Sequence, residues 1–330
     1  MNSAALFLKP SVKTGKTNVS DRLLEQTINA LIRQEGLPEA YAQTVEQTIL
    51  PLADHILALH DTKKRPVVAG IHGAQGTGKS TLTLFLREIL ARHRNCPTAS
   101  FSLDDIYLTR AERQDLAERV HPLFKTRGVP GTHDVVLGQR VLDQLRSAGP
   151  CDTTRIPSFD KSRDDRVPTG DWPAFPGRAE IILIEGWCLD ALPEDEGALR
   201  SPINRLEAEE DPKGTWRTYV NEQLKGGYRE FFGQIDCLVM LKAPSMECVL
   251  EWRCLQEQKL ARKTHGAPEG GEPGTCAQGL RIMNDDEVAR FVMHYERVTR
   301  ACLAEMPGRA DVLINVAEDH SLGLPQFRAD

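Results

Sequence analysis

Short apolar runs alternate with amphipathic segments along most of the chain. The runs lie at residues 67–71, 98–103, 181–184, 235–241 and 312–314, and each is expected to form a β-strand. Because these runs are apolar on both faces and helical patterns lie between them, they predict a parallel sheet that is covered on both sides. The expected fold class is therefore α/β, with three layers of helices, sheet and helices.

Two helices are expected before the first strand. Residues 1–19 have the composition of a loose tail, and the two helical segments that follow carry their apolar residues on one face, with Pro51 expected to kink the second. We interpret both helices as packing against the core, with binding of a partner as the alternative. The chain thus divides into an N-terminal part, 1–65, and a main domain, 66–330.

A long connection joins the second and third predicted strands. Residues 106–180 are rich in Pro, Gly, Arg and Asp and show no clear periodicity. Connections this long in a compact domain usually have a function. We therefore expect this insert to bind a substrate.

Composition and charge narrow the class of protein. The chain has 330 residues and a formal net charge of −6, which argues against nonspecific binding to nucleic acid. The most apolar stretch, 179–189, contains two glutamates and is too short to cross a membrane. No secretory signal is visible, and the eight cysteines show neither CxxC nor zinc spacing. These features favour a cytoplasmic protein that binds neither nucleic acid nor membrane.

The first predicted strand is followed by a phosphate-binding motif. The motif G-x-x-x-x-G-K-[ST] is matched in full, and the expected nucleotide-binding residues are Gly73, Ala74, Gln75, Gly76, Thr77, Gly78, Lys79, Ser80 and Thr81. Such a loop turns its backbone N–H groups toward phosphates at the N-terminus of a helix. Lys79 is expected to bridge the β- and γ-phosphates during catalysis, and the Ser80 hydroxyl to ligate Mg²⁺. The motif therefore predicts a P-loop NTPase-type sheet that binds a nucleoside triphosphate.

Glu185 ends the third predicted strand, where a second carboxylate near Mg²⁺ is expected. The alternative is that this glutamate only caps a local turn. No N-K-x-D element for reading guanine follows the fourth predicted strand, so ATP is favoured over GTP.

An acidic pair, Asp104 and Asp105, follows the second predicted strand, which we expect to lie beside the P-loop strand. Ligands bind at the carboxyl ends of strands in open α/β sheets. A carboxylate at that edge could accept the proton of an attacking hydroxyl, and Asp104 is the predicted base. The alternative is that the pair caps the turn into the next segment.

The insert supplies cations that suit an anionic acceptor. These are Arg127, Arg155, Lys161, Arg163 and Arg166. For each of them, solvation at the surface is the alternative interpretation. His133 is expected either to bond an acceptor hydroxyl or to satisfy a turn.

Together these residues resemble the plant-type D-glycerate 3-kinase family. That family belongs to the P-loop kinases, which also include phosphoribulokinase, uridine kinase and bacterial pantothenate kinase. The resemblance covers about residues 66–300 and rests on the P-loop and on segments at 102–109, 127–134, 160–162, 185–188, 216–221 and 252–257. Two departures are Ile106, where the family usually has an aromatic residue, and the Gly/Pro-rich stretch 264–279.

The resemblance implies Mg²⁺-dependent transfer of phosphate from ATP to the 3-hydroxyl of D-glycerate. Asp104 matches the acidic position that serves as base in the wider group. Arg253 and Arg262 fall in a helical lid region, at about 250–282. The residues expected to bind the acceptor are Tyr107, Arg127, His133, Asp134, Lys161 and Arg166. Alternative acceptors are a nucleoside, pantothenate or a sugar derivative, and a different class is a regulatory ATP-binding protein.

Overall fold

A six-stranded sheet forms the centre of the computed structural model. The structure describes the backbone of residues 19–265 and 284–328, and the side chains of all these except 256–265 and 285. The strand order is β10-β9-β8-β1-β7-β2. The strands are β1 (Val67–Gly73), β2 (Thr98–Ser102), β7 (Ile181–Gly186), β8 (Cys237–Lys242), β9 (Val312–Asn315) and β10 (Gln326–Phe327).

The parallel sheet expected from the apolar runs is confirmed. β1 pairs in parallel with both β7 and β8, and its residues are buried throughout. The short edge strand β10 is antiparallel to β9 and was not indicated by any apolar run. One expectation is wrong, because β2 does not neighbour the P-loop strand β1. β7 lies between them, so its carboxyl end separates the P-loop from the acidic pair after β2.

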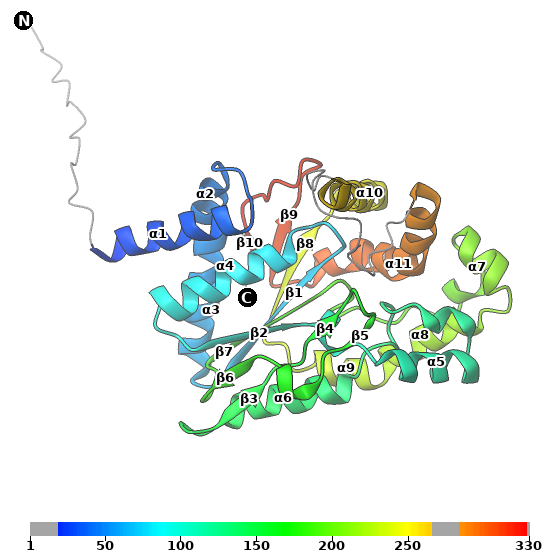
Figure 1. Ribbon diagram of the computed structural model, residues 1–330, viewed down its shortest axis with the longest axis horizontal. Helices are drawn as coiled ribbons and strands as arrows, with labels where there is room; N and C mark the ends of the chain where they lie inside the picture. The colour runs from blue at the N-terminus through cyan, green and yellow to red at the C-terminus, as the bar shows by residue number, and fades with distance from the viewer. Residues whose placement is uncertain (1–18, 266–283, 329–330) are drawn as a thin grey trace, which may run out of the picture.

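Helices cover both faces of the sheet (Figure 1). One face packs against α4 (Lys79–His93) and α3 (Leu50–Lys63), together with the first part of α10 (Met246–His265). The other face packs against α6 (Val135–Ser147), α8 (Thr215–Lys225) and α9 (Gly227–Phe232). α11 (Asp285–Glu305) contributes apolar side chains to both halves of the core.

The N-terminal helices share a core with the P-loop helix. α1 (Val19–Gln34) packs on α4, and α2 (Tyr41–Thr44) leads through a π-helical segment, Val45–Ile49, into α3. Pro51 stands in the first turn of α3 directly after the π-helical segment. Because proline has no N–H group, Pro51 cannot donate to the helical hydrogen-bond ladder at this point, and the kink itself stays a prediction.

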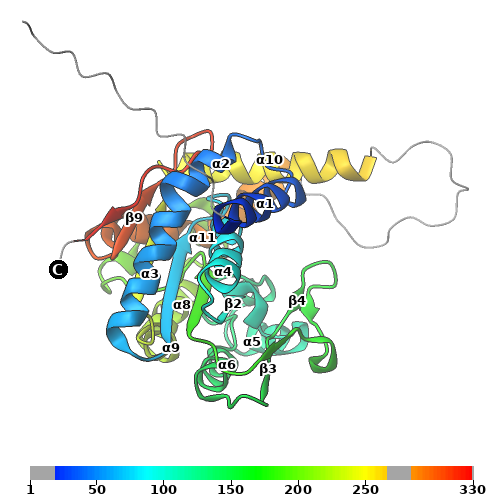
Figure 2. The same ribbon diagram turned by 90° about the vertical axis from the view of Figure 1, so that its left-hand side faces the viewer.

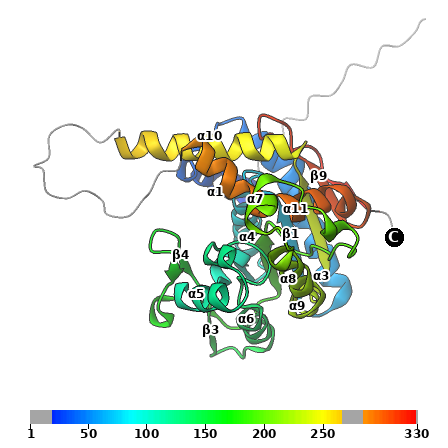
Figure 3. The same cartoon turned by 90° about the vertical axis from the view of Figure 1, so that its right-hand side faces the viewer.

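The insert is more ordered than its sequence suggests. It contains α5 (Arg110–Arg119), α6, a short β3–β6 sheet (Thr153–Arg155 with Ala174–Pro176) and the β4–β5 hairpin (Phe159–Asp160 with Asp165–Arg166). Figures 2 and 3 show that the β4–β5 hairpin and α10 project on the same side of the molecule. The 3-10 turns are Leu103–Ile106, Pro122–Lys125, Thr169–Asp171, Ala198–Arg200 and Met306–Gly308, and the remaining helix is α7 (Arg205–Glu210).

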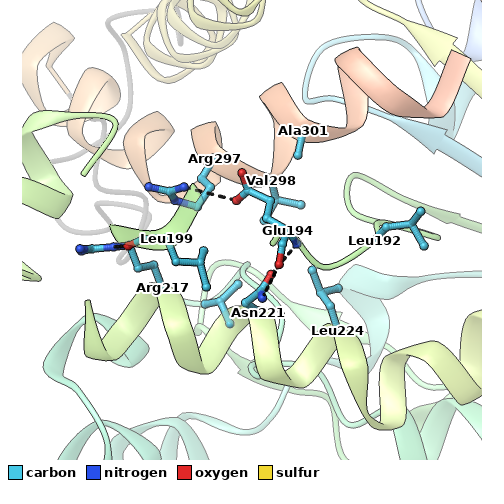
Figure 4. A pocket seen from close by; sticks show the side chains of 10 residues that line it. Leu192, Glu194, Leu199, Arg217, Asn221, Leu224, Arg297, Val298 and Ala301 are labelled. Carbon is cyan, nitrogen blue, oxygen red and sulfur yellow. Dashed lines mark hydrogen bonds and ion pairs between the residues drawn. The ribbon is translucent and has the colours of Figure 1, made fainter. Parts of the chain in front are cut away.

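A buried ion cluster holds α11 in place, and Figure 4 shows its ion pair between Arg297 and Glu194. The Arg297 guanidinium donates to both carboxylate oxygens of Glu207, at 2.8 and 2.6 Å, and lies 3.4 Å from Glu194. Glu207 is fully buried, so removing its cation would leave an uncompensated charge in the core. The cluster therefore fixes the helix that brings Tyr295 to the site described below. Among the described residues, no helix is both long and apolar enough to cross a membrane.

Candidate functional site

The P-loop forms a cradle between β1 and α4. Gly76 and Gly78 have φ angles of 85° and 83°, a left-handed conformation that glycine adopts readily. A Cβ atom on Gly76 would lie 2.7 Å from the Cβ atom of Trp252, so a side chain does not fit there. No side chain caps the N-terminus of α4 at Gly78. The first N–H groups of α4 are thus available to bind a phosphate.

Lys79, Ser80 and Glu185 meet at the mouth of this cradle. The Ser80 hydroxyl donates to Glu185 Oε1 at 2.8 Å, and the Lys79 ammonium lies 3.8 Å from Oε2. Glu185 is 7% exposed, and its Oε2 atom is buried without a hydrogen-bond partner. A hydroxyl beside an incompletely bonded carboxylate is the kind of oxygen donor set that Mg²⁺ takes, with phosphates and water as further ligands. No cluster of three or more His, Cys, Asp or Glu side chains suited to a metal occurs in the described part of the chain.

The two adjacent aspartates have different surroundings. Asp105 folds back on the strand end, where its Oδ2 atom accepts the Ser102 backbone N–H at 2.9 Å. Asp104 instead accepts the Tyr107 hydroxyl at 2.8 Å and the Lys161 ammonium at 2.5 Å. Asp105 therefore acts as a cap, whereas the carboxylate of Asp104 meets the cations of the site.

The pKa values of the pair diverge for physical reasons. Burial raises the pKa of Asp104, but the positive charges of Lys161 and Lys79 outweigh this effect and lower it to about 2. Burial raises the pKa of Asp105 to about 6, although the Ser102 hydrogen bond opposes this. The negative charge of Asp104 adds to the rise. Asp104 therefore stays ionised well below neutral pH, whereas Asp105 takes up a proton near pH 6.

His133 is buried beside Asp104 in a defined tautomer. Its ring stacks on Tyr107 with centroids 4.6 Å apart, and its Nδ1 atom lies 2.7 Å from the Tyr228 hydroxyl. That hydroxyl already accepts the N–H groups of Gly131 and His133, so its own proton goes to Nδ1. Burial lowers the pKa of His133 to about 4, which keeps the ring neutral. The proton must then sit on Nε2, which has no partner in the described structure.

The other residues predicted to bind the acceptor are largely engaged with the protein. Arg166 donates to the Tyr107 carbonyl at 2.7 Å and lies 3.4 Å from Asp134. Asp134 caps α6 by accepting the N–H of Leu137 at 2.8 Å. Arg127 pairs with Asp164 in the turn of the β4–β5 hairpin. These contacts favour a role in shaping the site, and the Lys161 side chain is more exposed than those of Arg127 and Arg166.

Two residues that the sequence did not indicate complete the wall of the site. Tyr228 on α9 orients His133, and Tyr295 on α11 donates to the Arg127 carbonyl at 3.0 Å while its ring packs on Trp187. Both belong to helices far along the chain, where their apolar periodicity gives the same signal as any core tyrosine. Only their position next to the site in the folded protein distinguishes Tyr228 and Tyr295 from other buried tyrosines.

The predicted lid is partly outside the described structure. Arg253 lies over the Phe291 ring, with its guanidinium carbon 5.3 Å from the ring centroid, so α10 contacts α11 at this point. Arg262 falls within the backbone range of α10, but its side chain is outside the described residues. The segment 266–283, which includes most of the Gly/Pro-rich stretch, is also outside them.

Comparison with similar proteins shows the family to which this chain belongs. The chain is 36% identical over 238 residues to the uncharacterized kinase mug58 of Schizosaccharomyces pombe, covering 70% of this chain and 79% of the relative. This chain belongs to the same P-loop kinase family. No family model matches it. A pantothenate kinase of Mesorhizobium japonicum is 32% identical over 129 residues, which span 38% of this chain and 37% of that relative.

Solved structures agree with the fold of this kinase. A D-glycerate 3-kinase from Cryptococcus neoformans superposes with a TM-score of 0.67 over 85% of this chain and 99% of its own, at 23% sequence identity. At that identity the likeness establishes the α/β P-loop fold. The relatives and the cradle together identify the protein as an ATP-dependent P-loop kinase.

Proposed function

We propose that this kinase transfers the γ-phosphate of ATP to a hydroxyl of a small acidic metabolite, with D-glycerate as the favoured acceptor and 3-phosphoglycerate as the product. The observation that carries the proposal is the position of Asp104. Its carboxylate is flanked by Lys161 and Tyr107, and it lies close enough to Lys79 for that charge to lower its pKa. An anionic base beside a cation suits an acceptor that is both a hydroxyl compound and an acid.

The arrangement supports a direct transfer. Asp104 would orient the acceptor hydroxyl and take its proton as the new bond to phosphorus forms. Lys79 would neutralise charge that develops on the transferred group, since positioning and electrostatic stabilisation account for most of phosphoryl transfer. The neutral His133 would offer its Nε2 proton to an acceptor oxygen. Tyr107, stacked on that ring, would hold the carboxylate of Asp104 in a single orientation.

Ser80 and Glu185 are the residues that would hold Mg²⁺ next to the phosphates. Held by these two residues, Mg²⁺ would supply positive charge that offsets part of the negative charge of the phosphates. The orphaned Oε2 atom of Glu185 supports this assignment.

The identity of the acid rests on similarity and on charge. The structural neighbour from Cryptococcus neoformans is described as a D-glycerate 3-kinase, whereas several partial sequence relatives are described as pantothenate kinases. Both acceptors contain a carboxylate and a primary hydroxyl. The cation beside Asp104 suits either of them better than it suits a neutral nucleoside.

An ADP-release assay with a panel of acceptors tests this function. D-Glycerate, pantothenate, uridine and a neutral sugar would each be added to the enzyme with ATP and Mg²⁺. We expect D-glycerate to stimulate ADP release well above the rate without acceptor. Stronger stimulation by pantothenate or uridine would overturn the choice of acceptor while retaining the kinase. If no hydroxyl compound changes the rate of ADP release, the result would favour a regulatory ATP-binding protein over a kinase.

A further inference from the structure

Both carboxylate oxygens of Asp104 are occupied before any acceptor binds. Oδ1 accepts the Tyr107 hydroxyl at 2.8 Å, and Oδ2 accepts the Lys161 ammonium at 2.5 Å. A base whose lone pairs are held by an ammonium group is a poor proton acceptor. Asp104 therefore becomes an effective base for an acceptor hydroxyl only once one of these partners moves.

Lys161 is the partner that can move. The Tyr107 side chain is buried between His133 and Phe159, with ring centroids 4.6 and 5.3 Å away. The Lys161 side chain is 60% exposed, and Asp104 is the partner the structure gives to its ammonium group. An exposed ion pair of this kind contributes little net stability, so exchanging it for another carboxylate requires little free energy.

The backbone that carries Lys161 is held firmly. Arg113, whose side chain is 1% exposed, donates to the Asp164 carbonyl at 2.7 Å and pairs with its carboxylate at 2.9 Å. At the tip of the hairpin, Asp160 accepts the backbone N–H of Ser162 at 2.9 Å. The ammonium group can thus swing on its own flexible stem while the hairpin remains in place.

We propose that Lys161 determines acceptor specificity by exchanging Asp104 for the carboxylate of the incoming acid. The proposal rests on the proposed function. The negative charge of the acceptor draws the ammonium group away from Asp104 Oδ2, and the acceptor hydroxyl takes its place. A neutral acceptor offers no replacement for the lost ion pair, so it is rejected even where it fits.

The chemical step then balances. The hydroxyl proton of the acceptor moves to Asp104 Oδ2, and the acceptor oxygen forms a bond to the γ-phosphorus. The bond between that phosphorus and the bridging oxygen of ADP breaks, and ADP leaves with the electron pair. Asp104 releases the proton to solvent, and Lys161 returns to it once the product departs.

Steady-state kinetics of Lys161→Met with D-glycerate and glycerol tests this exchange. The two acceptors share a three-carbon skeleton, but glycerol has no carboxylate. We expect kcat/KM for D-glycerate to fall at least about 100-fold, while kcat/KM for glycerol rises several-fold because Asp104 is no longer paired. Lys161→Arg should keep most of the preference for the acid. Lys125→Met, at an exposed lysine of the same insert, is the matched control and should change neither value.

Two kinetic outcomes would overturn the exchange. An equal loss with both acceptors would mean that Lys161 serves the fold or the nucleotide. An unchanged value for glycerol would make Lys161 a simple anchor for the carboxylate. Each result is read against the melting temperature of the variant, which should stay close to that of the wild type.

Basal ATP hydrolysis provides a readout that does not depend on the acceptor. With water as the acceptor, Lys161→Met should hydrolyse ATP faster than the wild type, and adding Asp104→Asn should abolish the gain. If the wild type ignores D-glycerate but this gain appears, the proposed acceptor is wrong and the release of Asp104 stands. If the gain is absent, the exchange is wrong whatever the acceptor.

Discussion

Replacing Asp104 by asparagine separates its chemical role from a structural one. The amide is similar in size and can still accept the Tyr107 hydroxyl, which lies 2.8 Å from Oδ1 in the native protein. It has neither the negative charge nor the basicity of the carboxylate. The ammonium group of Lys161 loses its partner but can turn into solvent, because that side chain is 60% exposed.

The two roles predict effects of different size. Loss of a general base typically lowers turnover about 10² to 10⁴-fold, which corresponds to about 3 to 5 kcal/mol in the activation free energy. Loss of an exposed ion pair changes the free energy of unfolding by about 1 kcal/mol or less. For a chain of 330 residues that is a shift of only about 1 to 2 °C in the melting temperature.

The assay compares turnover, nucleotide affinity and melting temperature in the wild type, Asp104→Asn and Asp105→Asn. We expect Asp104→Asn to lose turnover by the stated factor with nearly native ATP affinity and thermal stability. Asp105→Asn is the matched control and should lose less turnover, since Asp105 caps the turn. Nearly native turnover in Asp104→Asn with a large loss in Asp105→Asn would exchange the two roles and refute this reasoning.

Three further predictions concern neighbouring groups. Because burial raises the pKa of Asp105 to about 6, the native state binds its proton more tightly than the unfolded chain does, so stability should fall as pH rises from about 4 to 6. Asp105→Asn should flatten that fall in urea denaturation without nucleotide, and an unchanged pH profile would contradict the shift. Tyr228→Phe should raise the KM for the acceptor more than the KM for ATP, because His133 loses the donor that fixes its tautomer; equal rises would indicate a structural role. Lys79→Ala should abolish turnover while the circular dichroism spectrum stays native, and full activity would exclude the P-loop mechanism.

The parts of this fold that follow from local pattern could be predicted from the sequence. The apolar runs place the parallel strands, and the glycine spacing from Gly73 to Gly78 places the phosphate cradle at the end of β1. Strand order could not be predicted in the same way, because β7 pairs with both β1 and β2 across a long insert. A run of apolar residues indicates that a strand is buried, but it does not indicate which strands pair with it.

The features of the site that could not be predicted from the sequence depend on contacts between residues far apart in the chain. The acidic pair was recognisable as a candidate base, but only the fold separates the capping Asp105 from the paired Asp104. Arg127 carries the positive charge expected of a residue that binds an anionic acceptor, but in the structure it forms an ion pair with Asp164. The orienting role of Tyr228 depends on a hydroxyl that meets residues almost a hundred positions away, as the 95-residue separation from His133 illustrates.

Phosphorus NMR of a complete reaction tests the central claim most directly. Enzyme, ATP, Mg²⁺ and D-glycerate would be followed to completion, and the position of the new phosphomonoester assigned from its coupling to carbon-bound protons. The account predicts ADP and a single product phosphorylated on the 3-hydroxyl, with no product from Lys79→Ala. Release of inorganic phosphate alone, or transfer only when pantothenate or a nucleoside replaces D-glycerate, would contradict it.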